Sequence, residues 1–324
     1  MTDRRWVLGG ALVLIALPLL VVPIEAAAFY WHNRDNNSFM SSGEKREYLL
    51  YVPQSYDRSR PTALVISMHG AGLWGAAQKD ISLWNRVADA EGFIVVYPSA
   101  VGGKGFRIWH VEPGPGLPRD VTFISQLIDT VAARYNIDPT RIYANGLSNG
   151  GGMSFALSCT QSNRIAAVGL VGSAQTLPWT WCKDHRPVPM INFHGTADRL
   201  TPYKGGGTWV SPDHRGFPNQ LTWTANWAQR NHCAPNPVDS VVAPDVTRRL
   251  YTRCADDATV VLYSVRGGGH TWPGGGPMPE WYVGRTSRSI DASREMWAFF
   301  REHPLRNANT NAQQKIDTPL MQRR

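Results

Sequence analysis

Ser148 stands between glycines in the run Gly146-Leu147-Ser148-Asn149-Gly150, after a strand-like stretch and before a helix-like one. In that context G-x-S-x-G is the pattern of a nucleophile elbow, a sharp turn that projects a serine hydroxyl at the end of a sheet. The turn strains the serine backbone, and glycine is needed two positions away on either side because a side chain there would collide with neighbouring elements. The pattern predicts a nucleophilic serine, with a plain glycine-rich turn as the alternative.

A serine hydroxyl is a weak nucleophile, so it needs a base that is held in place by an acid. In folds with this elbow the chain order is serine, then Asp or Glu, then histidine. Asp198 follows the apolar run 188–193, and His270 follows the run 259–265, so each is expected just beyond the carboxyl end of a strand. Asp198 and His270 are therefore the predicted acid and base, with loop capping and a surface histidine as the respective alternatives.

An oxyanion formed during acyl transfer needs two N–H donors. We expect one from the backbone of Asn149, directly after the serine, and one from Ala71 in the loop after the apolar run 62–68. His69 and His194 also precede glycines at expected strand ends, but structural hydrogen bonding is the favoured role for both. The sequence shows no H-E-x-x-H or comparable ligand set, so we expect no metal and no cofactor.

Three tryptophans are expected to line the substrate crevice. Trp74 comes after the expected oxyanion loop, Trp109 lies in a glycine-rich loop, and Trp272 follows the predicted base by two positions. Packing in the core explains each of them equally well. Asp120, at the start of an expected helix, is predicted to be an N-cap rather than a catalytic acid.

The elements that position these residues alternate between short apolar runs and helical patterns. Expected strands cover residues 45–53, 62–70, 93–99, 141–146, 165–173, 187–195 and 259–270, and expected helices cover 81–92, 120–137, 149–159 and 290–303. Unbroken Val/Ile/Leu runs indicate strands that are buried on both faces. The pattern predicts an α/β fold with a mostly parallel central sheet, helices on both faces, and a crevice at the carboxyl ends of the strands.

We expect one catalytic domain over residues 29–303. It is interrupted at about 202–257 by an irregular insertion rich in Pro, Gly, Trp and Asn, with one helix-like piece at 219–233. Residues 304–324 are polar and predicted to be a disordered tail. The formal net charge is +8, but no basic block interleaved with aromatic residues appears, so nucleic-acid binding is not expected.

The N-terminus predicts export to the extracellular space or periplasm. Arg4 and Arg5 precede an uncharged apolar run over residues 6–24, and small residues near Ala28 offer a cleavage site, so residues 1–28 resemble a secretory signal. The run is also as long as a membrane span of roughly 20 residues. A cleaved signal and an uncleaved membrane anchor therefore both stay open.

The chain has four cysteines, an even count that suits disulfide formation in an oxidising compartment. Four cysteines allow three pairings. We favour Cys159–Cys182 and Cys233–Cys254, which close the shortest loops, with free buried thiols as the alternative.

The motifs GLSNGG, HGTAD and GGGHTWPGG, with NIDPTRIYANG before the elbow, resemble those of the extracellular polyhydroxybutyrate depolymerase family, which overlaps with feruloyl and acetylxylan esterases. The resemblance spans roughly residues 45–300. It implies an α/β-hydrolase fold, a secreted serine esterase without a cofactor, and a triad of Ser148, Asp198 and His270. Two features are expected to depart from the family: an extra glycine in SNGGGM, and the absence of an appended polymer-binding domain.

The expected function is hydrolysis of carboxylic esters through an acyl-enzyme. The substrate is a small ester, a polyhydroxyalkanoate oligomer or a feruloyl or acetyl ester of a plant polysaccharide. Two alternatives stay open: a serine peptidase of the same fold, and a non-catalytic surface binding protein.

Overall fold

A computed structural model describes residues 35–101, 106–173, 175–182, 186–208, 210 and 216–306. The expected signal or anchor at 1–28 and the tail from residue 307 onward lie outside these ranges. Within them, no helix is both long and apolar enough to cross a membrane.

The described residues form one ten-stranded sheet in the order β1-β2-β4-β3-β5-β6-β7-β10-β9-β8. The six central strands, β4-β3-β5-β6-β7-β10, pair in parallel. The antiparallel hairpins β1–β2 and β8–β9 extend the sheet at its two ends. The strands are β1 (Asn37–Ser41), β2 (Glu44–Tyr51), β3 (Thr62–Met68), β4 (Ile94–Pro98), β5 (Ile137–Leu147), β6 (Ala167–Val171), β7 (Met190–Gly195), β8 (Val238–Ala243), β9 (Val246–Tyr251) and β10 (Val260–Val265).

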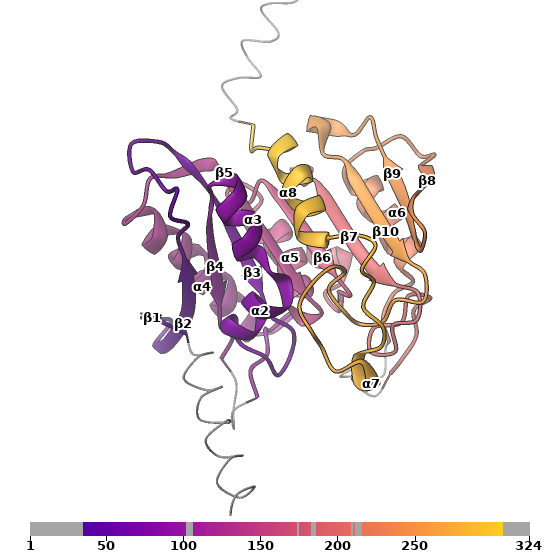
Figure 1. The fold of residues 1–324 in the computed structure, drawn as a ribbon, viewed down its shortest axis with the longest axis horizontal. Helices are drawn as coiled ribbons and strands as arrows, with labels where there is room; N and C mark the ends of the chain where they lie inside the picture. The colour runs from indigo at the N-terminus through magenta and orange to yellow at the C-terminus, as the bar shows by residue number, and fades with distance from the viewer. Residues whose placement is uncertain are drawn as a thin grey trace, which may run out of the picture.

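Helices cover both faces of this sheet. One apolar core contains residues of α4, α5 and α6, and a second core contains residues of α2, α3 and α8; Figure 1 shows α3 and α8 on the side that faces the viewer. The helices are α2 (Gly75–Ser82), α3 (Trp84–Glu91), α4 (Gly116–Ala132), α5 (Asn149–Thr160), α6 (Gln220–Arg230), α7 (Glu280–Val283) and α8 (Ala292–Glu302). The predicted α/β class with a mostly parallel sheet is confirmed.

Two expected helices have other boundaries. The helix expected at 81–92 is two helices, because Leu83 adopts a left-handed conformation (φ 56°) that ends α2 and begins α3. Helix α4 begins at Gly116, four residues before Asp120. The N-cap role predicted for Asp120 is therefore wrong: its buried carboxylate accepts hydrogen bonds from Arg46 and His110 instead.

The segment at 202–257 is more regular than expected. It contains the predicted helix, α6, and also the antiparallel hairpin β8–β9, which pairs with β10. Strand β8 is the last strand of the sheet, and most of its side chains are exposed. Because that exposure removes the alternation of buried and polar residues, the sequence of β8 carries no clear strand signal.

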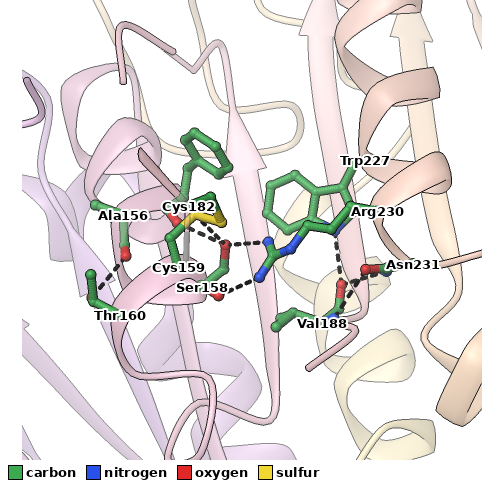
Figure 2. The surroundings of a disulfide bond; sticks show 10 residues. Ala156, Ser158, Cys159, Thr160, Cys182, Val188, Trp227, Arg230 and Asn231 are labelled. Atoms are coloured by element: carbon green, nitrogen blue, oxygen red, sulfur yellow. Dashed lines mark hydrogen bonds between the residues drawn. A yellow bond between two sulfur atoms is a disulfide. The ribbon is translucent and has the colours of Figure 1, made fainter. Parts of the chain in front are cut away.

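Both favoured disulfides are present, Cys159–Cys182 and Cys233–Cys254. The first ties the end of α5 to the segment after the 3₁₀ helix Trp179–Trp181. Beside it, the guanidinium of Arg230 on α6 donates to the hydroxyl and the carbonyl oxygen of Ser158 (Figure 2). The end of the helix that follows the predicted nucleophile is thus joined both covalently and by hydrogen bonds to its neighbours.

Candidate active site

Ser148 lies at the corner between β5 and α5 with φ 55° and ψ −119°, a backbone conformation that L-residues rarely adopt. The flanking glycines explain how the chain accommodates it. A Cβ on Gly146 would lie 2.3 Å from the carbonyl carbon of Gly150, and a Cβ on Gly150 would lie 2.2 Å from the carbonyl oxygen of Met68. No larger residue fits at either position, so the local geometry is that of a nucleophile elbow.

Asp198 and His270 come together beyond the carboxyl ends of β7 and β10, two strands that pair in parallel. Nδ1 of His270 lies 2.7 Å from Oδ2 of Asp198. An ionised carboxylate only accepts hydrogen bonds, so Nδ1 carries the proton and Nε2 is left as the basic atom. Burial would raise the pKa of Asp198, but the charge and hydrogen bond of His270 outweigh burial and lower it below the usual range.

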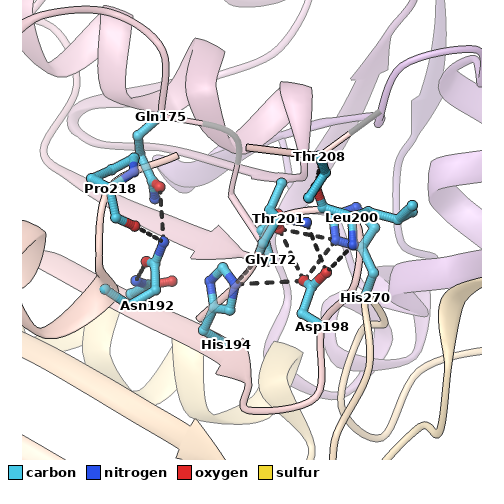
Figure 3. A network of polar contacts seen from close by, with 11 residues as sticks. Gly172, Gln175, Asn192, His194, Asp198, Leu200, Thr201, Thr208, Pro218 and His270 are labelled. Carbon is cyan, nitrogen blue, oxygen red and sulfur yellow. Dashed lines mark hydrogen bonds and ion pairs between the residues drawn. The ribbon is translucent and has the colours of Figure 1, made fainter. Parts of the chain in front are cut away.

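Thr201 completes this pair, and the sequence reasoning missed it. Its hydroxyl oxygen lies 2.9 Å from Oδ2 of Asp198 and 3.1 Å from Nδ1 of His270, and its backbone N–H donates to Oδ1 of Asp198 (Figure 3). The same hydroxyl oxygen lies 3.0 Å from the carbonyl oxygen of Gly172, so its single proton is shared between this carbonyl and the carboxylate. A threonine three residues after an aspartate was the only signal in the sequence, and it is too common to single out.

His194 lies on the far side of Asp198 from His270 and is fully buried. Its Nε2 is 2.7 Å from the carbonyl oxygen of Thr201 and 3.5 Å from Oδ2 of Asp198. Burial lowers the pKa of His194, which keeps the imidazole neutral, although the nearby Asp198 opposes this shift. These contacts agree with the structural role favoured for this histidine.

The loop after β3 carries the expected second oxyanion donor, Ala71. Among the hydrogen bonds of the described residues, none uses the N–H of Ala71 or of Asn149. The buried His69 fixes this loop: Nδ1 lies 2.7 Å from the carbonyl oxygen of Gly70, and Nε2 accepts the N–H of Ala100 at 2.9 Å. Both ring nitrogens of His69 are thus engaged with backbone, so its predicted structural role agrees with the structure.

A cavity of about 1690 Å³ opens in front of these groups and is lined by Ser148, His270, Asn149 and Ala71. Most of its wall is apolar, from residues such as Phe217 and Met278. In the described part of the chain no hydrogen bond joins the Ser148 hydroxyl to His270. Catalytic hydrogen bonds are often long before substrate binds, so the shared cavity wall is the relevant observation.

The three tryptophans expected to line the crevice are placed differently. Trp74 lies on the cavity wall at the start of α2, and Trp109 lines the cavity but is almost fully buried, with its indole N–H on the carbonyl oxygen of His69. Trp272 is not among the residues that line the cavity. It is buried in the core beneath α8 and donates to Ser293, so the alternative of core packing agrees with its place in the structure.

The chain is similar in sequence and in fold to proteins named as esterases. The chain is 27% identical over 238 residues to the bifunctional acetylxylan esterase/xylanase XynS20E of Neocallimastix patriciarum, covering 73% of this chain and 32% of that protein. It is 29% identical over 236 residues to feruloyl esterase B of Piromyces equi, covering 69% and 42%. The chain therefore corresponds to less than half of the length of either relative.

Among solved structures, the acetyl xylan esterase from Aspergillus awamori superposes with a TM-score of 0.60 at 16% sequence identity, covering 82% of this chain and 98% of that one. Together with the parallel sheet, the strained serine and the paired Asp198 and His270, this likeness assigns the fold to the α/β-hydrolase class. Residues 46–176 match the family described as esterase PHB depolymerase.

Proposed function

We propose that the chain is an exported serine esterase that hydrolyses carboxylic esters through a covalent acyl-enzyme. The observation that carries the proposal is that Ser148, held in a strained turn, and His270, oriented by Asp198, line the same cavity. The matched family, together with relatives named as feruloyl and acetylxylan esterases, supports the same chemistry.

The proposed reaction has two acyl-transfer steps. Nε2 of His270 takes the proton of the Ser148 hydroxyl as the oxygen attacks the ester carbonyl carbon. The tetrahedral oxyanion accepts hydrogen bonds from the N–H groups of Asn149 and Ala71, and the positive end of the α5 dipole favours the same charge. The intermediate collapses as His270 protonates the leaving alcohol. Water then enters, gives its proton to His270 and releases the acid by the same route.

Asp198 has two tasks in this scheme. It fixes the tautomer of His270 through Nδ1, and its negative charge stabilises the imidazolium that forms in each step. The carboxylate is held in place by three hydrogen-bond donors, which are the backbone N–H groups of Leu200 and Thr201 and the hydroxyl of Thr201. This environment suits a carboxylate that stays ionised through the reaction.

The proposed substrates are polyhydroxyalkanoate oligomers or feruloyl and acetyl esters of plant polysaccharides. The large, mostly apolar cavity accommodates an extended acyl or aromatic group, and the names of the relatives favour the plant-polysaccharide esters. Export is proposed from the N-terminal pattern together with the two disulfides, which belong to an oxidising compartment. N-terminal sequencing of the mature protein would distinguish a cleaved signal from an anchor at residues 6–24.

The test uses a fluorophosphonate probe and a substrate panel. The probe should label wild-type protein and leave Ser148→Ala unlabelled. The wild type should hydrolyse p-nitrophenyl acyl esters, and methyl ferulate, acetylated xylan and polyhydroxybutyrate would define the substrate. Faster cleavage of peptide amides would favour the peptidase alternative, and no turnover of any ester together with ligand binding would favour the non-catalytic one.

A further inference from the structure

We propose that His110 is a substrate-binding residue that recognises a hydroxyl group on the ester, an assignment that rests on the proposed esterase function. His110 lines the same cavity as Ser148 and His270, and its side chain is 51% exposed. It follows Trp109, whose backbone is held by the side-chain amide of Asn149. Oδ1 of Asn149 accepts the N–H of Trp109 at 2.7 Å, and Nδ2 of Asn149 donates to the carbonyl oxygen of Trp109 at 3.0 Å. The peptide that precedes His110 is therefore fixed to the residue after the nucleophile.

A buried carboxylate orients this histidine. Oδ2 of Asp120 accepts both the backbone N–H of His110, at 2.8 Å, and its Nδ1, at 2.9 Å. Arg46, whose side chain is almost fully buried, donates to Oδ1 of Asp120 at 2.8 Å and stacks on Phe123. Because an ionised carboxylate only accepts, Nδ1 must carry the proton, which leaves Nε2 as the free atom of the imidazole.

Helix α4 supplies a second constraint on the ring. Its first residue is Gly116, and a Cβ built there would lie 2.3 Å from Cγ and Cδ2 of His110. The backbone of Gly116 thus lies directly against the imidazole. A side chain held at one ring atom and pressed against a backbone loses little further entropy when a ligand binds, so this is a pre-organised contact rather than a mobile surface histidine.

The chemistry of the free atom defines the ligand. In the neutral imidazole Nε2 is a lone-pair acceptor. In a mostly apolar cavity such an acceptor favours a substrate that brings an O–H donor over an isosteric substrate without one, because a bound substrate without a donor covers the half-exposed imidazole and leaves Nε2 unpaired. Two classes of ester carry such a donor: a hydroxylated aromatic acyl group and a sugar alcohol. The inference is that His110 discriminates esters by a hydroxyl, whichever part of the substrate carries it.

The experiment measures kcat/KM for substrate pairs that differ in hydroxyl groups. Methyl 4-hydroxycinnamate is compared with methyl cinnamate, and acetylated xylobiose with cyclohexyl acetate. His110→Ala should lower kcat/KM about tenfold for the hydroxylated member of one pair and change the other member less than twofold, consistent with the loss of one hydrogen bond. The pair that responds identifies whether the hydroxyl is phenolic or belongs to the sugar.

Three further variants separate recognition from general damage. His110→Gln, whose amide oxygen can still accept, should recover part of the discrimination. Gly116→Ala keeps the histidine but displaces the ring, and should lower the discrimination as His110→Ala does. Arg294→Ala removes an exposed cation that does not line the cavity and should leave the discrimination unchanged. Equal losses on both members of each pair, or no loss on either, would overturn the assignment.

A binding measurement distinguishes this failure from failure of the esterase proposal. Calorimetric titration of Ser148→Ala with the same ester pairs needs no turnover. Preference for a hydroxylated ester that is lost in Ser148→Ala/His110→Ala supports the role of His110 even if no ester is hydrolysed. Hydrolysis by the wild type without any hydroxyl preference would retain the esterase and reject the role of His110.

Discussion

Two histidine–aspartate pairs face one cavity, and they are built alike at the point of contact. Nδ1 of His270 lies 2.7 Å from Asp198, and Nδ1 of His110 lies 2.9 Å from Asp120. Both carboxylates are almost fully buried. The imidazoles differ in access, since the side chain of His270 is 5% exposed and that of His110 is 51% exposed.

The larger difference lies in what balances each carboxylate. Asp120 has a full positive partner in Arg46. Among the ion pairs of the described residues, Asp198 is joined only by the histidines His194 and His270, and its other partners are neutral donors. A carboxylate whose charge is not already neutralised stabilises a proton on its histidine, whereas a neutralised one mainly fixes the ring. Under the proposed roles, proton transfer and orientation need different surroundings for the same pair of side chains.

The largest expected effect tests this difference at the rate of hydrolysis. Asp198→Asn should lower kcat on p-nitrophenyl acetate about 10⁴-fold, because the amide favours the wrong tautomer of His270 and no longer stabilises the imidazolium. Asp120→Asn, the matched change in the other pair, should lower kcat less than tenfold. Steady-state kinetics on folded protein checks both, and similar losses in the two variants would remove the proposed division of roles.

Stability should respond in the opposite order. Asp120→Leu leaves the guanidinium of Arg46 buried without its partner, and removing one member of a buried ion pair costs about 3–5 kcal/mol. Asp198→Asn keeps a polar group at its site and should cost less. Urea unfolding measures both free energies. The double variant Arg46→Met/Asp120→Leu is the control and should regain much of the loss, because no buried charge then remains unpaired.

The comparison also separates what the sequence predicted from what it did not. The alternation of apolar runs and helices predicted the sheet, and the ends of those runs located Ser148, Asp198 and His270, because each signal is local. The roles of Asp120 and Arg46 depend on a contact between residues 74 positions apart, which no local pattern reports. Strand β8 was missed because an exposed edge removes the pattern of burial.

A third histidine, His69, shows what burial does without a carboxylate partner. Burial lowers its pKa to about 4, with smaller contributions from Arg107 and Arg46, while the Gly70 hydrogen bond opposes the shift. The unfolded chain binds this proton near pH 6.5 and the folded chain does not, so stability should fall as pH drops from about 6.5 to about 4. The loss from this residue is about 3 kcal/mol, because one pKa unit is worth about 1.4 kcal/mol.

Chemical denaturation between pH 7 and pH 4.5 measures this dependence. His69→Gln does not titrate, so its stability should depend less steeply on pH, even if it is less stable throughout. His194 and His303, whose pKa values burial also lowers, should supply the remaining slope. An unchanged slope in His69→Gln would show that another group controls the acid sensitivity.

The smallest expected effect concerns Thr201, whose hydroxyl donates to Asp198, the carboxylate that pairs only with histidines among the described residues. Thr201→Val keeps the shape and removes the donor, and one hydrogen bond to a charged group is worth about 1.5–3 kcal/mol. At the lower end of that range, kcat should fall about tenfold with little change in KM. Because Asp198 then loses a donor that favours its ionised form, the acid limb of the pH–rate profile should also move to higher pH.

Thr201→Ser retains the hydroxyl and should restore both kcat and the profile. If kcat of Thr201→Ser were as low as that of Thr201→Val, the methyl group of Thr201 rather than its hydroxyl would matter. The neutral donors around Asp198 would then not explain why His270 differs from His110.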